Sequence, residues 1–253
     1  MFDLKGHVSV ITGGNGGIGL GMARGLAKVG ANIAVWGRNK EKNIQAIEEL
    51  TSLGVEAKAF FCDVSMENQI VKSMADTLAY FGRVDSCFAN AGITNSIDKS
   101  STETTLQEWQ RVLDVNLTGV FMTFREAAKH MIARGGGGKL IATSSIGSLQ
   151  GANRNSSYAA TKAGVNAIVR SLAVELARNN IQVNAIVSGW ISTDMTVNFK
   201  TFEKLNNSII QRTPARRWGE PSDFEGLAVY LASPESNFLT GTAIPIDGGY
   251  TVF

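Results

Sequence analysis

The chain has few of the residues that build disulfide scaffolds or metal centres. Its 253 residues include two cysteines, Cys62 and Cys87, and two histidines, His7 and His130. Each cysteine lies at the end of an apolar run, so we expect buried thiols; a disulfide framework is implausible in so large a chain. The histidines stand far apart without cysteines at ligand spacing, which argues against a metal site.

Two further absences narrow the class of protein. The net charge of +2 includes no strong basic excess, which argues against a nucleic-acid partner. No apolar stretch approaches the ~20 residues that a membrane helix requires. Residues 1–6 carry no apolar signal-peptide core, because a strand pattern begins almost at once. We therefore expect a cytoplasmic protein with neither a nucleic acid nor a membrane as partner.

Short β-branched runs alternate with longer helical patterns along almost the whole chain. This alternation predicts a parallel sheet covered by helices on both faces. No linker rich in proline or charge interrupts it, so we expect a single doubly wound α/β domain over residues 1–253, with seven mainly parallel strands. The strands are expected near 8–12, 31–36, 55–61, 84–89, 139–144, 181–187 and 242–246, and the helices over 17–29, 40–53, 66–81, 105–133, 156–178 and 222–232.

A glycine-rich turn follows the first predicted strand. Residues 12–19 read Thr-Gly-Gly-Asn-Gly-Gly-Ile-Gly, and a helical pattern begins within them. Strand, glycine turn and helix in that order are the context of a dinucleotide-binding fingerprint. The glycines let the backbone approach a pyrophosphate, and the helix N-terminus offers free N–H groups to it. A glycine turn with no cofactor is the structural alternative.

The second chemical signal is the pair Tyr158 and Lys162, with Ser145 thirteen residues upstream. Residues four apart lie on one face of a helix, so Lys162 is expected to hold its charge near the phenol. A neighbouring cation favours the phenolate of a tyrosine, whose ordinary pKa is about 10. Tyr158 then becomes a general acid for a ketone or a base for an alcohol. The pair alone is weak, since an amphipathic tyrosine beside a solvated lysine is common, but with the glycine turn it predicts cofactor-dependent redox chemistry.

Over essentially its whole length the chain resembles the short-chain dehydrogenases/reductases of about 250 residues, with a Thr-Gly-x-x-x-Gly-x-Gly turn and a Tyr-x-x-x-Lys pair. This resemblance implies a Rossmann-type fold and a homotetramer. It implies a catalytic tetrad of Asn116, Ser145, Tyr158 and Lys162. The cofactor-binding residues that it implies are Gly13, Asn15, Gly17, Ile18, Gly19, Arg38, Asp63, Val64, Asn90, Ala91, Gly92, Tyr158, Lys162, Gly189, Ile191 and Thr193.

The resemblance also implies the roles of the tetrad. Tyr158 transfers the proton, Ser145 holds the substrate oxygen, Lys162 bonds the nicotinamide ribose, and Asn116 holds a water. Ser144 is the rival of Ser145, but the family spacing and the alternation of side chains along a strand favour Ser145. Two positions depart from the pattern: Ala89 often is asparagine in relatives, and Ser188 usually is proline. Serine there leaves the turn looser or supplies a hydroxyl to a ligand, and both readings stay open.

The cofactor preference is predicted from the residues after the second strand. Relatives that select NAD carry an acid where this chain has Gly37, which Arg38 and Asn39 follow. Arginine suits a 2′-phosphate through its planar, permanently charged fork. We therefore expect NADP in preference to NAD, with NAD still possible, because residues 14–16 add no second basic residue. The alternative is that Arg38 merely stacks on the adenine.

The substrate is less well indicated. The first expectation is an NADPH-dependent carbonyl reductase or secondary-alcohol dehydrogenase of a small or medium ketone. The alternatives are a 3-oxoacyl thioester on an acidic carrier protein, received by Arg125, Lys129 and Arg134, and a polyol or sugar acid, bound by Asn153 and Arg154. A non-catalytic NADP-binding protein is the alternative outside this class. Residues 191–215, irregular but with apolar residues at helical spacing, are expected to form a mobile lid over the substrate.

Overall fold

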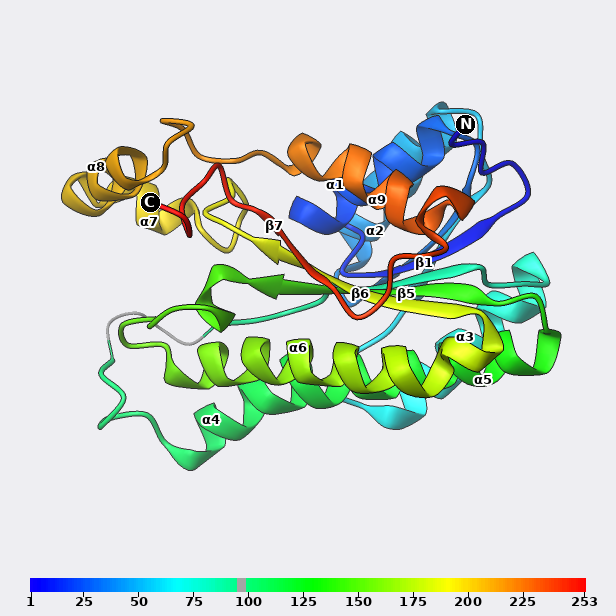
Figure 1. The fold of residues 1–253 in the computed structure, drawn as a ribbon, viewed down its shortest axis with the longest axis horizontal. Helices are drawn as coiled ribbons and strands as arrows, with labels where there is room; N and C mark the ends of the chain where they lie inside the picture. Colours follow the sequence, from blue (N-terminus) through cyan, green and yellow to red (C-terminus); the bar gives the residue numbers. More distant parts are fainter. Residues whose placement is uncertain (95–98) are drawn as a thin grey trace.

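One parallel sheet organises the molecule (Figure 1). The computed structural model describes residues 1–94 and 99–253. All strand pairs are parallel, in the order β3-β2-β1-β4-β5-β6-β7, which confirms the predicted fold class. The strands are β1 (Val8–Thr12), β2 (Asn32–Gly37), β3 (Ala57–Phe61), β4 (Ser86–Ala89), β5 (Gly138–Ser145), β6 (Ile181–Ser188) and β7 (Ala243–Ile246). The strand order reverses between β1 and β4, and such a switch point is where ligands of open α/β sheets bind.

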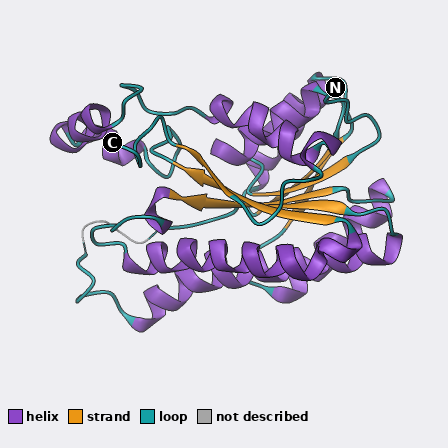
Figure 2. Ribbon diagram, viewed as in Figure 1, coloured by secondary structure: helices purple, strands orange, loops and turns teal. Residues whose placement is uncertain are grey.

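Helices cover both faces of the sheet (Figure 2). The group α1, α2 and α9 lies on one face, and α3 to α6 lie on the other (Figure 1). None of the helices in the described part of the chain is both long and apolar enough to cross a membrane. The helices are α1 (Gly17–Lys28), α2 (Lys40–Ser52), α3 (Glu67–Phe81), α4 (Leu106–Leu113), α5 (Gly119–Arg134), α6 (Ser156–Leu176), α7 (Val197–Thr201), α8 (Glu203–Arg212) and α9 (Glu225–Ala232).

Two apolar cores lie on the two faces of the sheet, because successive strand residues point to opposite faces. Val10 and Cys87 belong to the core under α3 to α6, whereas their neighbours Ile11 and Phe88 belong to the core under α1 and α9. Both cysteines are buried free thiols, as expected. Burial raises the pKa of Cys62 to about 11 and that of Cys87 to about 12, so neither is a thiolate at neutral pH.

The chain is helical over residues 106–134, as expected for 105–133, but the helix is not uniformly α-helical. After α4 the chain forms a π-helical turn, η1 (Asp114–Thr118), before α5 begins. Gly119, directly after this turn, lies close to the loop after β3. An added Cβ would be 2.7 Å from the backbone oxygen of Val64. Helical periodicity does not reveal the extra residue of such a turn, and π-turns are frequent at functional sites. Here the turn carries Asn116.

The contact between α1 and the segment before α9 gives a test of the packing. A Cβ at Gly21 would lie far inside van der Waals distance of the Pro221 carbonyl oxygen, whereas nothing lies within 4 Å of a Cβ at Gly226 in α9. We expect Gly21→Ala to lower the free energy of unfolding by about 1–3 kcal/mol, as overpacking does. The matched Gly226→Ala should raise it by about 0.4–1 kcal/mol, since it only restricts the unfolded chain. Urea denaturation of both variants measures this, and equal stabilities would contradict the described contact.

Candidate active site

The glycine turn forms an open cradle at the N-terminus of α1. Gly13 and Gly17 have φ values of +64° and +51°, which side-chain-bearing residues rarely adopt. A Cβ at Gly19 would collide with the carbonyl oxygen of Gly13, so α1 can lie this close to the turn only with glycine at position 19. The first turn of α1 has no side-chain cap and no acidic residue. Its free N–H groups and the positive end of the helix dipole therefore suit an anion.

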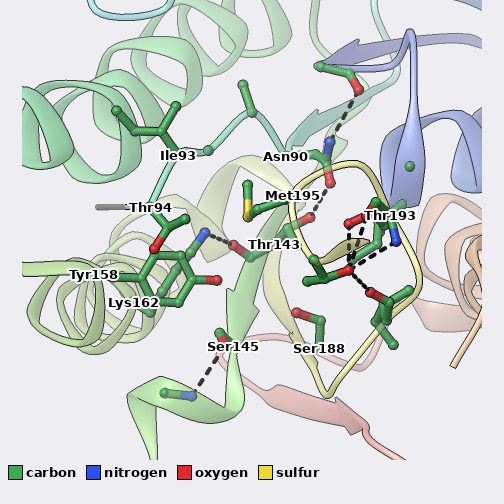
Figure 3. A pocket seen from close by; sticks show the side chains of 18 of the residues that line it. Asn90, Ile93, Thr94, Thr143, Ser145, Tyr158, Lys162, Ser188, Thr193 and Met195 are labelled. Atoms are coloured by element: carbon green, nitrogen blue, oxygen red, sulfur yellow. Dashed lines mark hydrogen bonds between the residues drawn. The ribbon is translucent and has the colours of Figure 1, made fainter. Parts of the chain in front are cut away.

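A hydrogen-bond network, which we call the switch-point network, joins the carboxyl ends of β1, β4 and β5. The Thr12 hydroxyl accepts from the backbone N–H groups of Asn90 (2.9 Å) and Ala91 (3.0 Å). The Asn90 amide donates to the Thr12 carbonyl at 3.1 Å and accepts from the Thr143 hydroxyl at 3.0 Å. The Thr143 carbonyl accepts from Lys162 Nζ at 2.7 Å (Figure 3). A continuous set of bonds thus links the glycine turn to Lys162.

A cavity of about 880 Å³ opens at these strand ends. It runs from the loop after β2 to the lid segment, residues 191–215. Two of the site residues expected from the sequence, Gly19 and Asn116, are buried behind its wall. The expected residues that line it are Gly13, Asn15, Gly17, Ile18, Arg38, Asp63, Val64, Asn90, Ala91, Gly92, Ser145, Tyr158, Lys162, Gly189, Ile191 and Thr193.

Ser145 and Tyr158 meet at the cavity wall (Figure 3). The Ser145 Oγ accepts a hydrogen bond from Gly147 N–H at 3.2 Å, and the Ser145 side chain also hydrogen-bonds Tyr158. Ser144, its rival, points the other way and donates to the Lys162 carbonyl at 3.2 Å. Strand alternation therefore puts Ser145 in the cavity and Ser144 against α6.

The electrostatics of Tyr158 differ from the expectation of a lowered pKa. Burial raises the pKa of Tyr158, and the hydrogen bond with the Ser145 side chain only partly opposes this. Lys162 Nζ lies 5.5 Å from the centre of the phenol ring and donates to Thr143 instead. Desolvation of the phenolate therefore outweighs the neighbouring cation. The phenol keeps its proton at neutral pH, which suits it to donate to a carbonyl oxygen.

Lys162 and Asn116 converge on the loop after β4. The Lys162 side chain is buried, and burial lowers its pKa from 10.5 to about 8. A Cβ at Gly92 would lie 3.4 Å from Asn116 Oδ1 and 3.6 Å from Lys162 Nζ. Asn116 also bonds both backbone groups of Ile93, accepting from its N–H and donating to its carbonyl, each at 2.8 Å. The π-turn thus fixes this loop against the lysine.

Ser188, which replaces the usual proline, bonds the backbone. Its hydroxyl donates to the Ser144 carbonyl at 3.1 Å, so it ties β6 to β5 beneath the cavity. The sequence left two possibilities for this serine, a looser turn and a hydroxyl that bonds a ligand. A bond to the backbone is neither of them. This bond could not be predicted, because the register that sets Ser188 beside Ser145 arises only from strand pairing.

The adenosine end of the cavity holds four charges. Arg38 donates to Asp63 at 3.1 Å, and Asp63 also accepts from Ser65. Burial raises the pKa of Asp63, but the bonds from Ser65 and Arg38 outweigh it and lower that pKa. Lys42, in the first turn of α2, also lines the cavity and forms an ion pair with Asp194 of the lid segment. Lys42 was not predicted as a site residue. Its position three residues after the helix cap Asn39 places it in the first turn of α2, and this position was the signal that could have found it.

The lid segment covers the other end of the cavity with α7 and α8. Trp190 contacts Phe199 and Trp218 edge-on, with ring centres 5.6 Å apart in each pair. Asn153 and Arg154, expected from the sequence as sugar-acid contacts, line the cavity together with Gln150. Met195, Phe199, Leu205 and Arg212, which also line it, belong to the segment expected to lie over the substrate, whereas sequence reasoning did not assign Tyr250 to the site.

Comparison with known proteins agrees with this architecture. Residues 13–251 match the family model described as enoyl-(acyl carrier protein) reductase. The chain is 39% identical to 2-dehydro-3-deoxy-D-gluconate 5-dehydrogenase of Escherichia coli over 98% of this chain and 97% of that one. It is 37% identical to 5-keto-D-gluconate 5-reductase of the same organism, covering 100% and 98%.

Solved structures show the same likeness. A gluconate 5-dehydrogenase from Burkholderia cenocepacia, in complex with NADP and tartrate, superposes with a TM-score of 0.94 at 34% identity, covering 100% of this chain and 98% of that one. The chain therefore belongs to the short-chain dehydrogenase/reductase family. It is an NAD(P)-dependent oxidoreductase acting on alcohol and carbonyl groups.

The buried lysine predicts a pH dependence of stability. Because its folded-state pKa of about 8 lies below the unfolded value of 10.5, the folded state binds fewer protons between these pH values. The contribution of Lys162 to stability therefore rises with pH across this window. Relative to a Lys162→Met variant, the wild type should gain on the order of 3 kcal/mol between pH 8 and 10.5. Denaturation curves at several pH values measure it, and a constant difference would contradict the buried, depressed lysine.

Proposed function

We propose that the protein is an NADP-dependent dehydrogenase/reductase of a six-carbon sugar acid, acting on the secondary alcohol or ketone at C5. The observation that carries this is the polar lining of the cavity, where Gln150, Asn153 and Arg154 line the same cavity as Ser145 and Tyr158. The names of the relatives support it, since each acts at C5 of a gluconate or its keto derivative. The sugar-acid alternative is thus better supported than the first expectation of a small or medium ketone.

The residues of the cavity fit a dinucleotide. The glycine cradle and the uncapped start of α1 suit the pyrophosphate, and Asp63 and Val64 lie where the adenine end is expected. Arg38 and Lys42 are two cations at the end of β2 that suit a 2′-phosphate, which supports NADP over NAD. NADP in the Burkholderia structure adds support. When bound, the nicotinamide supplies or accepts a hydride at its C4.

The chain itself supplies proton transfer and orientation. Tyr158 donates its phenolic proton to the substrate oxygen during reduction and takes it back during oxidation. Ser145 donates a hydrogen bond to the same oxygen, while its Oγ accepts from the backbone N–H of Gly147. Lys162, held by Thr143 and close to Asn116, positions the ribose and supplies positive charge as the phenol ionises.

Two alternatives lose support. An acidic carrier protein was expected to contact Arg125, Lys129 and Arg134, but each already lies in an ion pair. Arg125 pairs with Glu67 and Glu126, Lys129 with Glu126, and Arg134 with Asp85. A non-catalytic binder is disfavoured because Ser145, Tyr158 and Lys162 are all retained around one cavity.

The homotetramer and the mobility of the lid segment remain predictions from the family resemblance, and the cytoplasmic location remains a prediction from the sequence. The C-terminal segment supports a subunit contact, because Val252 and Phe253 are exposed apolar side chains. Long helices on one outer layer, α4 to α6, are the second expected contact (Figure 1).

Turnover of 5-keto-D-gluconate tests the proposed reaction. We expect its NADPH-dependent reduction with a kcat/KM well above that of cyclohexanone or acetoacetyl thioester. Tyr158→Phe should lower kcat by about 10²–10⁴-fold, the range for a lost general acid, while NADPH binding followed by fluorescence stays within about threefold. Higher kcat/KM for the plain ketone or the thioester would overturn the sugar-acid assignment, and retained turnover in the variant would overturn the role of Tyr158.

Replacing Arg38 tests the cofactor preference. Charge-assisted bonds to a phosphate contribute about 1.5–3 kcal/mol, so Arg38→Asp should lower the NADP/NAD ratio of kcat/KM by roughly 10–100-fold or more. Lys40→Asp is the matched control, since it makes the same charge change on an exposed residue two positions away. An unchanged ratio in Arg38→Asp would show that Arg38 only stacks on the adenine.

A further inference from the structure

Arg212 lies at the substrate end of the cavity and is held there by two neighbours. It is the last residue of α8, within the lid segment. Its guanidinium carbon lies 4.4 Å from the centre of the Tyr250 ring, and its Nη2 donates to Gln150 Oε1 at 3.0 Å. All three residues line the cavity. The cation–π contact and the hydrogen bond hold the guanidinium at the cavity and leave its other N–H donors available.

This arrangement stands beside the catalytic serine. Tyr250 is buried and packs with Ile146 and Val187 in a small apolar cluster. Ile146 directly follows Ser145, and its carbonyl accepts from the backbone N–H of Gln150 at 3.2 Å. Both groups that hold Arg212 are therefore attached to the short turn that begins at Ser145.

Among the described residues that line the cavity, no carboxylate is paired with Arg212. The lining carboxylates Asp63 and Asp194 are paired with Arg38 and Lys42 at the adenosine end. Within residues 1–94 and 99–253, Arg212 forms no ion pair and uses one of its five N–H donors in a side-chain bond. A guanidinium with free, oriented donors is the group best suited to bind a carboxylate with two parallel hydrogen bonds.

We propose that Arg212 binds the carboxylate of the substrate, with Gln150 and Tyr250 as positioning residues. This inference rests on the proposed sugar-acid function and adds to it the residue that selects acids over neutral sugars. The carboxylate end of the substrate would contact α8 of the lid segment, while its reacting carbon faces Ser145 and Tyr158. Binding of the acid would therefore tie the lid segment to the loop after β5.

Arg154 is the competing cation. It also lines the cavity and, like Arg212, is exposed; its backbone is left-handed, with φ +57°. After the hydrogen bonds from Ser100, its charge helps to lower the pKa of the exposed Glu103. Arg154 therefore interacts electrostatically with Glu103 on the protein surface, whereas Arg212 lies over the Tyr250 ring at the cavity wall.

A pair of substrates that differ only in the carboxylate tests the inference. 5-Keto-D-gluconate and L-sorbose share the ketone and its hydroxyl neighbours, and the sugar carries a hydroxymethyl group in place of the acid. In Arg212→Met we expect kcat/KM for the acid to fall on the order of 30-fold, mainly through KM, and that for L-sorbose to change less than about threefold. Calorimetric titration of D-gluconate into the enzyme with NADPH, a pair that cannot react, should show a matching rise in Kd.

Control variants separate this role from others. Lys204→Met removes an exposed cation from the same helix and should leave both substrates unaffected. Arg212→Lys keeps the charge but loses the fork, so it should recover part of the acid preference. NADPH affinity and the melting temperature report whether each variant folds, and Arg212→Lys keeps the test decisive if Arg212→Met does not fold.

The outcomes distinguish two failures. If the wild type shows no preference for the acid over L-sorbose, the proposed function fails and this inference fails with it. If the wild type prefers the acid but Arg212→Met loses activity equally toward both substrates, Arg212 only positions the lid segment and the inference alone is overturned. A selective loss in Arg154→Met but not in Arg212→Met overturns it in favour of the competing cation.

Discussion

The switch-point network is the constraint on which the site depends. Thr12, Asn90 and Thr143 come from the ends of three different strands, and their hydrogen bonds hold those ends at fixed distances. The same bonds serve the glycine turn on one side and Lys162 on the other. The phosphate cradle and the proton-transfer group are therefore parts of one rigid unit, in which a shift at either end must strain the other. Pre-organisation of this kind lets a site stabilise developing charge without reorganising.

Burial shifts the pKa values of the two ionisable groups of the site, Tyr158 and Lys162, in opposite directions. It raises the pKa of Tyr158 and lowers that of Lys162, so each group favours its neutral form. A neutral phenol is the proton donor needed for reducing a ketone. The reverse reaction needs the phenolate, which becomes accessible only when added positive charge offsets the desolvation. An oxidised nicotinamide would bring such charge, so the protonation of the site and the redox state of its cofactor are coupled by electrostatics.

Much of the fold and the site could be predicted because the signals are local. The seven strands follow from β-branched runs, and the cradle follows from glycines that a tight turn and close packing require. The choice of Ser145 over Ser144 follows from strand alternation. The π-turn at Asn116 could not be predicted, because its extra residue leaves the helical pattern almost unchanged. The sign of the Tyr158 shift was also beyond the sequence, since desolvation depends on how completely the folded protein surrounds the phenol.

Long-range pairing explains the remaining omissions. Lys42 and Asp194 are separated by 152 residues, and Arg212 and Gln150 by 62, so no periodicity connects them. Both pairs join the lid segment to the body of the protein, one at each end of the cavity.

At the adenosine end the lid contributes an acid that competes with a phosphate for Lys42. At the substrate end it contributes a cation that a carboxylate can engage. An acid-bearing substrate would add an ionic contact to the lid segment at one end of the cavity. A phosphate-bearing cofactor would compete with the existing ion pair between Lys42 and Asp194 at the other end. Under the proposed function, the position of the lid segment would therefore depend on both anions, a dependence that neither end of the cavity has alone.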